Sequence, residues 1–266
     1  MFNVTIISIA TDRYVQFWAN LVRSYYALPE PDLNFKWVVL TDSGQKLPKD
    51  IVELLGTRLQ IFQIEHEPWP FVTLYRYKYI NEIRNFLTDE LLVYIDADMK
   101  FSGNFLPFSI MANNAGSRLA FVKHPGFYRS RTIFSINSIR NPLLFMKDFL
   151  KKLIYGGIGA WETRKISTAF VPRKFRKHYY IGAIWFGYRD AFLEMCEYLS
   201  IQVTLDESCG VIAKWHDESH LNSYANKIEH LALNPEFCFA TSYKALANLK
   251  PIISVVDKNE SSGWIR

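Results

Sequence analysis

The chain has 266 residues, of which 49% are hydrophobic, 16% aromatic and 21% charged, and its formal net charge is +5. This composition excludes a disordered or collagen-like chain and predicts a globular protein that can bury a sizeable core. The mild positive charge suits an anionic ligand but does not demand nucleic acid. The three cysteines are widely spaced and support neither a zinc ribbon nor a disulfide framework, so a reduced, cytoplasmic setting is expected.

The sequence opens on MFNVTIISIA, which lacks the basic region of a signal peptide and begins a strand almost at once. No apolar run approaches the roughly 20 residues that a membrane span needs. We therefore expect a soluble protein without a transmembrane anchor. No repeat, low-complexity segment or linker divides the chain, and residues 1–266 are predicted to form a single domain.

In chain order, short apolar runs alternate with segments of helical periodicity. Strands are predicted over Asn3–Ile9, Phe35–Leu40, Arg58–Ile64, Leu91–Ile95, Leu119–Val122 and Tyr179–Gly187. Helices are predicted over a stretch that Asp12 caps and that reaches Tyr25, over Val72–Leu87, over 142–155, over Arg189–Leu199 and from about Trp215. This order predicts an α/β fold, with a largely parallel sheet flanked by helices.

The stretch LLVYIDADMKF (Leu91–Phe101) joins a buried strand to two carboxylates. Alternate residues of a strand face opposite sides, so Asp96 and Asp98 can point the same way where the strand ends. The carboxyl ends of strands are also where ligands bind in open α/β sheets. We interpret the pair as ligands of a divalent metal that holds a diphosphate, either Mn²⁺ or Mg²⁺. The plainer alternative is two solvated aspartates that open a loop.

The segment WHDESHLN (Trp215–Asn222) places two histidines and two carboxylates at a predicted helix start. Asp217 is a plausible helix cap and Glu218 suits the helix dipole, so capping alone can explain both. A carboxylate in a partly dry pocket can also act as a nucleophile or stabilise a cation. His216 and His220 have the spacing of a zinc helix, but the glutamate is misplaced for H-E-x-x-H, which disfavours a zinc hydrolase.

A phosphatase is an alternative for the aspartate pair, because a strand that ends in D-x-D-x-[TV] uses its first aspartate as a nucleophile. Lys100 stands where the threonine or valine should be, which weakens that interpretation.

Two basic segments bear on partners. The helix over 142–155 places its apolar residues on one face, namely Phe145, Met146, Phe149, Leu150, Leu153 and Ile154. We expect this helix to pack on the domain, with peripheral contact to a membrane through 143–155 as the alternative. The run Arg173–His178 is interpreted as a solvated loop rather than a phosphate or nucleic-acid contact, and no nucleic-acid partner is expected.

Four segments resemble glycosyltransferase family 6, in order VYIDADMKF (Val93–Phe101), HPGFY (His124–Tyr128), YYIGAIWFG (Tyr179–Gly187) and WHDESHLN (Trp215–Asn222). The resemblance runs from about Ile9 to Lys258, with an apparent insertion near Leu143–Trp161. The family includes the ABO blood-group transferases, the α1,3-galactosyltransferase and bacterial relatives. It implies a GT-A fold, in which a Rossmann-like nucleotide-sugar-binding half (about 1–122) continues into an acceptor-binding and catalytic half (about 123–266).

The resemblance implies transfer of galactose or N-acetylgalactosamine from a UDP-sugar to a galactoside-containing glycan, with retention and an α1,3 bond. It implies Mn²⁺ at Asp96 and Asp98, and Glu218 as the catalytic carboxylate, either as nucleophile or as electrostatic stabiliser. Donor-binding positions carried over are Ile9, Ala10, Thr11, Tyr14, Arg76, Asp96, Ala97, Asp98, Ile181, Gly182, Ala183, Asp217 and Lys258. Acceptor-binding positions carried over are His124, Trp215 and Glu218.

Three departures from the family pattern matter. Ala240 stands where relatives carry an aspartate, which puts the usual acceptor contacts in doubt, and Trp185 replaces a smaller aromatic residue. The membrane anchor and stem of animal members have no counterpart in the sequence, so we expect a soluble bacterial or phage-type member. The alternative function is a sugar- or nucleotide-binding module with little turnover.

Overall fold

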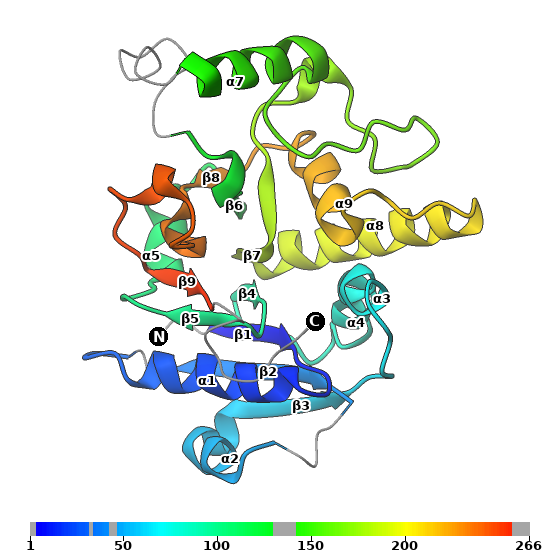
Figure 1. Ribbon diagram of the computed structural model, residues 1–266. Coiled ribbons are helices and arrows are strands. Elements are labelled where there is room, and N and C mark those ends of the chain that lie inside the picture. Colours follow the sequence, from blue (N-terminus) through cyan, green and yellow to red (C-terminus); the bar gives the residue numbers. More distant parts are fainter. Residues whose placement is uncertain (1–3, 32–33, 43–46, 130–141, 257–266) are drawn as a thin grey trace.

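A twisted sheet with helices on both faces forms the centre of the protein (Figure 1). The computed structural model describes residues 4–31, 34–42, 47–129 and 142–256. Within them the main sheet has seven strands in the order β3-β2-β1-β4-β7-β6-β8. These strands are β1 (Val4–Ile9), β2 (Phe35–Thr41), β3 (Leu59–Gln63), β4 (Leu91–Ile95), β6 (Leu119–Lys123), β7 (Tyr180–Tyr188) and β8 (Leu231–Leu233). Two further strands, β5 (Met99–Phe101) and β9 (Ile253–Val255), pair antiparallel in a small second sheet.

The main sheet is mostly parallel. β1 pairs in parallel with β2 and β4, β2 with β3, and β6 with β8. β7 is the exception, since it runs antiparallel to both of its neighbours, β4 and β6. The predicted α/β class is confirmed, and the expected strands lie within one or two residues of the observed ones.

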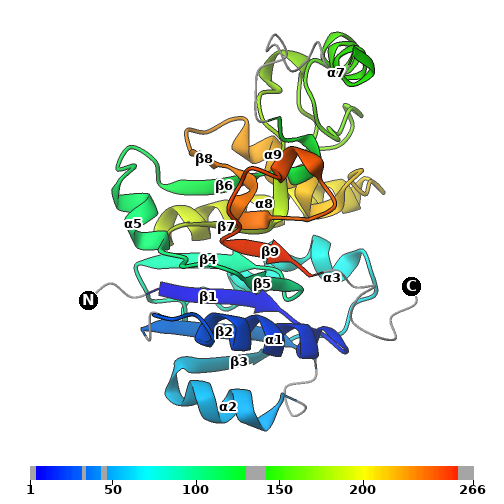
Figure 2. The same ribbon diagram turned by 60° about the vertical axis from the view of Figure 1, so that its left-hand side comes forward.

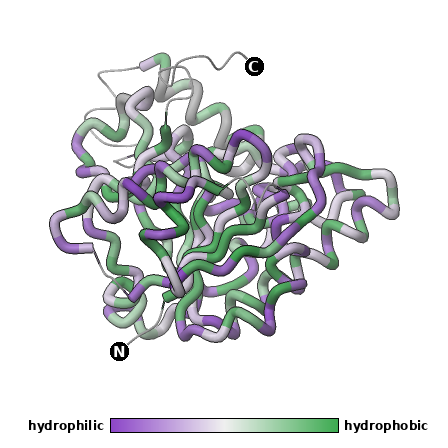
Figure 3. The backbone as a smooth tube through the Cα atoms, turned by 90° about the horizontal axis from the view of Figure 1, so that it is seen from below, coloured by the Kyte–Doolittle hydropathy of each residue, from purple (hydrophilic) through white to green (hydrophobic). Residues whose placement is uncertain are grey.

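Two apolar cores lie on opposite faces of the sheet. The helices are α1 (Tyr14–Tyr26), α2 (Lys49–Leu55), α3 (Phe71–Leu74), α4 (Arg76–Glu82), α5 (Pro107–Ala112), α7 (Pro142–Tyr155), α8 (Arg189–Ser208) and α9 (His216–Ala225). One core packs α1 and α5 against the sheet, and the other packs α4 and α8 against its opposite face (Figure 2). Hydropathy colouring shows apolar residues along the chain segments that cross the middle of the molecule (Figure 3).

Some local expectations were wrong. Asp12 does not cap the first helix, because α1 begins at Tyr14 and Asp12 itself has a positive φ of 47°. The helix expected over Val72–Leu87 breaks at Tyr75, where the carbonyl of Thr73 accepts a hydrogen bond from Arg76 Nε (3.1 Å). α8 extends to Ser208 because buried side chains continue at helical spacing beyond Leu199.

α7 also departs from expectation. It forms as predicted over Pro142–Tyr155, but the described side chains of its apolar stripe are exposed rather than packed on the domain. None of the helices in the described part of the chain is long and apolar enough to cross a membrane.

A buried carboxylate ties the first strands together and generates a stability prediction. Asp89, almost fully buried, accepts a hydrogen bond from the Thr5 hydroxyl (2.7 Å) and pairs with Lys36 (2.6 Å). Asp89→Ala leaves the Thr5 hydroxyl without its partner, so we expect a loss of about 2–4 kcal/mol in the free energy of unfolding, measured by urea denaturation.

The matched control is Asp50→Ala, which breaks the exposed ion pair of Asp50 with Arg23 (2.7 Å). This variant should lose less than about 1 kcal/mol. Equal losses in the two variants would show that Asp89 has no special role.

Candidate active site

Arg76, at the start of α4, is the buried centre of the site and is only 3% exposed. Its Nη1 donates to the carbonyl of Gly182 on β7 (2.7 Å). The same atom lies 3.4 Å from Asp96 Oδ1, after β4, and 3.3 Å from Asp217 Oδ2 on α9. A single guanidinium therefore connects three elements that are far apart in the sequence.

Asp96 lies where β4 ends, and its carboxylate contacts the side chains of Tyr94 and Arg76. Tyr94 Oη donates a hydrogen bond to Asp96 Oδ1 (2.8 Å), and Arg76 forms an ion pair with the same oxygen. The Arg76 guanidinium also lies over the Tyr94 ring. Burial raises the pKa of Asp96 to about 6; Arg76 opposes this rise and the negative charge of Asp98 adds to it. The two aspartates of the D-x-D motif are therefore close enough to repel each other.

The aspartate pair fits a hard divalent cation in its chemistry. Carboxylate oxygens are the ligands that Mn²⁺ and Mg²⁺ prefer, and a cation would relieve the repulsion between Asp96 and Asp98. No cluster of three or more His, Cys, Asp or Glu side chains that could enclose a metal is present among the described residues. A cation held by this pair would thus need further oxygen ligands from water or from a bound phosphate.

Gly182 lets β7 approach α9 closely. Its N–H donates to Glu218 Oε2 (3.0 Å), and a Cβ at this position would lie 2.9 Å from Asp217 Oδ2. Burial raises the pKa of Glu218 to about 7, although the Gly182 N–H and the Tyr179 hydroxyl favour the charged form. Glu218 is therefore a carboxylate poised between its two protonation states near neutral pH.

Asp217 is not the helix cap that the sequence suggested. α9 begins at His216, and the backbone N–H of Trp215 donates to Ser219 Oγ (2.9 Å). The Asp217 side chain is instead buried and turned to Arg76, and its burial raises its pKa. Capping alone therefore does not explain this carboxylate.

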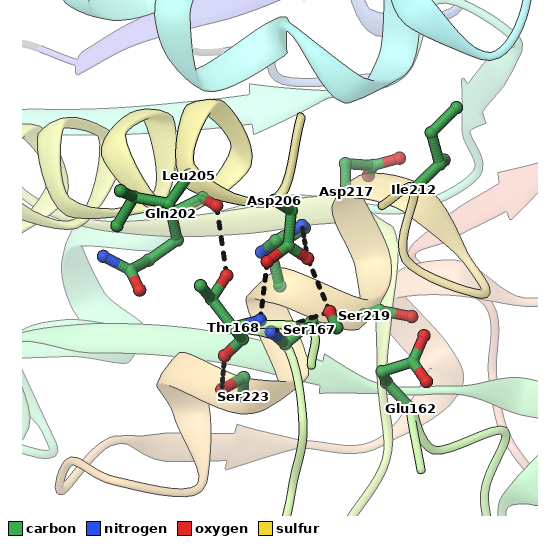
Figure 4. A network of polar contacts seen from close by, with 12 residues as sticks. Glu162, Ser167, Thr168, Gln202, Leu205, Asp206, Ile212, Asp217, Ser219 and Ser223 are labelled. Carbon is green, nitrogen blue, oxygen red and sulfur yellow. Dashed lines mark hydrogen bonds and ion pairs between the residues drawn. The ribbon is translucent and has the colours of Figure 1, made fainter. Parts of the chain in front are cut away.

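A polar network anchors α9 to α8 beneath the site (Figure 4). Asp206 on α8 accepts hydrogen bonds from Ser167 Oγ (2.5 Å) and the Thr168 N–H (2.6 Å). Ser223 on α9 donates to the carbonyl of Thr168 (3.3 Å), so residues 167–168 bridge the two helices. The network holds the helix that carries Asp217 and Glu218.

The two histidines of WHDESHLN point to different surroundings. The His216 ring contacts the exposed ring of Trp69 edge to face, with centroids 4.9 Å apart. His220 is buried with its Nε2 3.6 Å from Asp206, and burial lowers the pKa of His220 to about 4. Their separation agrees with the sequence argument against a zinc helix.

His124 lies beside Tyr179, the residue that precedes β7. The His124 N–H donates to the carbonyl of Tyr179 (2.8 Å), and His124 Nδ1 accepts from the Gly126 N–H (3.0 Å). Burial lowers the pKa of His124 to about 4, so the ring is neutral at pH 7 and carries its proton on Nε2. Trp215 is half exposed.

The other predicted donor-binding residues follow β1, next to β4. Because β1 and β4 run parallel, their carboxyl ends meet at one edge. Asp96 and Ala97 directly follow β4, Ile9 ends β1, Ala10 and Thr11 follow it, and Tyr14 begins α1. Ile181 and Ala183 flank Gly182 on β7. Lys258 lies outside the described residues, but the N–H of Val256, two residues before it, donates to the carbonyl of Asp98 (3.1 Å).

Sequence reasoning overlooked two tyrosines. Tyr94 lies two residues before Asp96, so strand alternation could have placed both on the same side. Tyr179 is buried near Glu218, whose charge contributes to a raised pKa of the Tyr179 phenol after burial itself. No spacing relates Tyr179 to Glu218, and only the fold brings them together.

Trp185 does not line the site directly. It is fully buried, stacked on Tyr94 with ring centroids 5.1 Å apart and packed on Phe192 (4.5 Å). Trp185 therefore reaches the site through two tyrosines: Tyr94, which donates to Asp96, and Tyr77, whose hydroxyl donates to the carbonyl of Asp217 (3.1 Å). Ala240 is partly exposed and its carbonyl accepts from the N–H of Tyr243 (3.1 Å).

The chain is similar to known proteins over its length. The model of glycosyltransferase family 6 matches residues 158–266. The O-antigen biosynthesis glycosyltransferase WbnI of Escherichia coli is 25% identical over 98% of this chain and 97% of its own length. The histo-blood group ABO system transferase 1 of Rattus norvegicus is 28% identical over 71% of this chain, and the chicken (Gallus gallus) globoside alpha-1,3-N-acetylgalactosaminyltransferase 1 is 23% identical over 96%.

The chain spans 46% of the rat transferase's length and 67% of the chicken enzyme's length. The sheet, the family match and these relatives define a glycosyltransferase with a GT-A fold. The family model and these relatives together show that the chain is similar to members of glycosyltransferase family 6.

The central guanidinium can be tested by its effect on stability at two pH values. Arg76→Met removes the cation that favours ionised Asp96 and Asp217, so both pKa values should rise further. Burying the ionised carboxylates then costs more free energy, so the free energy of unfolding should fall by about 3–5 kcal/mol at pH 8. The fall should be smaller at pH 5, because protonation of the carboxylates removes unpaired buried charge. Denaturant unfolding at both pH values measures the difference.

Arg76→Lys is the control, because it keeps a positive charge while it loses the planar fork. We expect a smaller loss and a weaker dependence on pH. A loss for Arg76→Met that is the same at pH 5 and pH 8 would contradict the electrostatic account.

Proposed function

We propose that the protein is a retaining, Mn²⁺-dependent transferase that moves galactose or N-acetylgalactosamine from a UDP-sugar to the 3-hydroxyl of a galactoside, forming an α1,3 bond. The observation that carries this proposal is the convergence of Asp96, Arg76, Asp217 and Glu218 around Gly182. The names of the ABO and globoside alpha-1,3-N-acetylgalactosaminyltransferase relatives support the sugar class.

Each group around Gly182 has a distinct role in this proposal. Asp96 and Asp98 hold the metal, which neutralises charge on the leaving diphosphate when it is bound. Asp217, fixed by Arg76, accepts hydrogen bonds from hydroxyls of the donor sugar. His124 and Trp215 contact the acceptor, and the Nε2–H of neutral His124 suits a hydroxyl or ring oxygen.

Glu218 is the proposed catalytic carboxylate. In the transfer, the bond from the anomeric carbon to the diphosphate oxygen breaks and its electron pair leaves with UDP. The acceptor oxygen then forms the new bond to the anomeric carbon and passes its proton to an oxygen of the departing diphosphate. A carboxylate beside the anomeric carbon stabilises the positive charge that develops there, either as a covalent nucleophile or electrostatically. The Gly182 N–H orients this carboxylate.

The donor sugar is proposed to meet β7 at Ile181, Gly182 and Ala183. Gly182 brings this strand into close contact with Asp217, since a Cβ there would lie 2.9 Å from Asp217 Oδ2, and Ala183 is the small residue next to it. Ala183 resembles the galactose-preferring pattern, whereas a relative such as the chicken enzyme is named for N-acetylgalactosamine. Both donors therefore belong in the first assay.

A binding module with little turnover is the second candidate function. Ala240 favours it, because an alanine cannot supply the carboxylate that the family resemblance implies at this position. A bare binder would release no UDP from any UDP-sugar, with or without metal.

The decisive assay measures UDP release from UDP-galactose, UDP-N-acetylgalactosamine and UDP-glucose, with a galactoside acceptor and with Mn²⁺ or EDTA. We expect release from one of the first two donors, lost in EDTA. Glu218→Gln should lower kcat at least a hundredfold, since it removes the charge while keeping the shape. The exposed Glu229→Gln is the matched control and should leave kcat unchanged.

Release that persists in EDTA would overturn the metal assignment of Asp96 and Asp98. Full activity of Glu218→Gln would overturn the catalytic assignment. Release from no donor, even with several galactosides, would favour the binding module.

The pH profile provides an independent check on Glu218. Its pKa is raised to about 7, and the proposed role needs the carboxylate form. Lowering the pH through 7 protonates Glu218, so kcat/KM should fall about tenfold per pH unit well below that value. A profile that instead falls as the pH rises from 6 to 8 would show that Glu218 acts as an acid.

A further inference from the structure

α7 presents a row of apolar side chains to solvent. Leu143, Met146, Leu150, Leu153 and Ile154 repeat at the spacing of one helix face, and each is between 45% and 81% exposed. A contiguous exposed stripe of this kind marks an interaction surface, because isolated exposed apolar residues are common whereas an aligned row is not.

A basic turn lies against the end of this stripe. The 3-10 turn η4 (Arg173–Phe175) meets α7 where Arg173 donates to the carbonyl of Leu153, and a Cβ on Gly156 would lie 2.8 Å from Arg173. Arg173, Lys174 and Lys177 are exposed, and so is the ring of Phe175. We call the stripe together with residues 173–177 the α7 surface.

The charge of the chain is concentrated in this region. Residues 142–180 contain nine Lys and Arg residues and only two carboxylates, Asp148 and Glu162, a net charge of +7. Glu162 is itself buried and paired with Arg164 (2.7 Å). The rest of the chain holds 22 basic and 24 acidic residues, so it is slightly negative. The positive charge therefore belongs to the α7 surface and its surroundings.

We propose that the α7 surface docks on a lipid bilayer that carries anionic headgroups. An amphipathic helix with apolar residues on one side and lysines and arginines nearby is suited to lie in the plane of such an interface. α7 lies at one extremity of the molecule, outside the sheet and the helices that cover it (Figures 1 and 2), so a flat bilayer can reach it.

A second copy of the chain fits this surface less well. A symmetric dimer through α7 would bring two segments of net charge +7 face to face, which is repulsive. An anionic bilayer offers the complementary charge and an apolar layer at once.

The α7 surface is connected to the active site through aromatic packing. Trp161, which follows α7, packs edge to face on Tyr179 with ring centroids 5.1 Å apart. Tyr179 in turn adjoins Glu218 and His124. Docking would therefore place the side of the molecule that carries Tyr179 and His124 toward the membrane. This inference does not depend on the identity of the sugar donor.

Co-sedimentation with vesicles tests the proposal without any sugar substrate, so its outcome is independent of the transferase assay. The full chain should bind vesicles of phosphatidylglycerol and phosphatidylcholine, and bind pure phosphatidylcholine at least tenfold more weakly. Leu150→Asn/Leu153→Asn should lower the partition coefficient at least tenfold. Lys174→Glu/Lys177→Glu should lower it to a similar extent on the mixed vesicles.

Matched controls change the same residue types elsewhere. Ile201→Asn/Leu205→Asn alters two exposed apolar side chains on α8, and Lys49→Glu/Lys250→Glu alters two exposed lysines. Both controls should bind vesicles within about twofold of the native chain. Circular dichroism verifies that every variant is folded.

Failure of the native chain to bind, equal binding to neutral vesicles, or equal losses in the controls would overturn the proposal. A dimer in sedimentation velocity that Leu150→Asn/Leu153→Asn dissociates would also overturn it, since the α7 surface would then be a contact between copies.

Discussion

The site depends on one buried cation. Arg76 has lost its hydration, and burying a guanidinium costs several kcal/mol unless carboxylates and carbonyls replace the lost water. Asp96, Asp217 and the carbonyl of Gly182 provide that replacement. Burying either carboxylate without Arg76 would also be unfavourable, because burial disfavours the ionised form and raises the pKa of Asp96 and of Asp217. The three elements that carry them are consequently held in one arrangement, and displacing any one leaves an unpaired buried charge.

Asp217 and Glu218 show how neighbouring carboxylates acquire different properties from their surroundings. Asp217 faces Arg76, whereas Glu218 has the Gly182 N–H and a phenol beside it and has a pKa of about 7. Asp217 is suited to stay ionised, whereas Glu218 is suited to carry a charge that changes during the reaction. Helix α9 can present both because Asp206, Ser167 and Thr168 fix it from beneath.

Local sequence patterns predicted the α/β class and the strands β1, β2, β3, β4, β6 and β7, since these follow from runs of apolar residues and from alternation along a strand. They missed the three-residue strands β5, β8 and β9, which are too short to show a pattern. They could not predict that β7 is antiparallel, or that Asp217 turns to Arg76, because both depend on contacts between distant segments. Capping preference misassigned Asp12 and Asp217 for the same reason. Helical periodicity predicted α7 correctly but did not predict that its apolar side chains are exposed. The sequence pattern of an apolar helix face is the same whether that face packs on the rest of the protein or not.

The antiparallel insertion of β7 has a consequence for how the chain is made. β4 and β6 leave the ribosome long before β7, yet in the finished sheet each pairs with β7 and they do not pair with each other. Until Tyr188 has been synthesised, both strands keep an open edge that can pair wrongly. A fragment that stops near residue 122 would hence leave β4 without its partner β7, and β6 without both of its partners, β7 and β8.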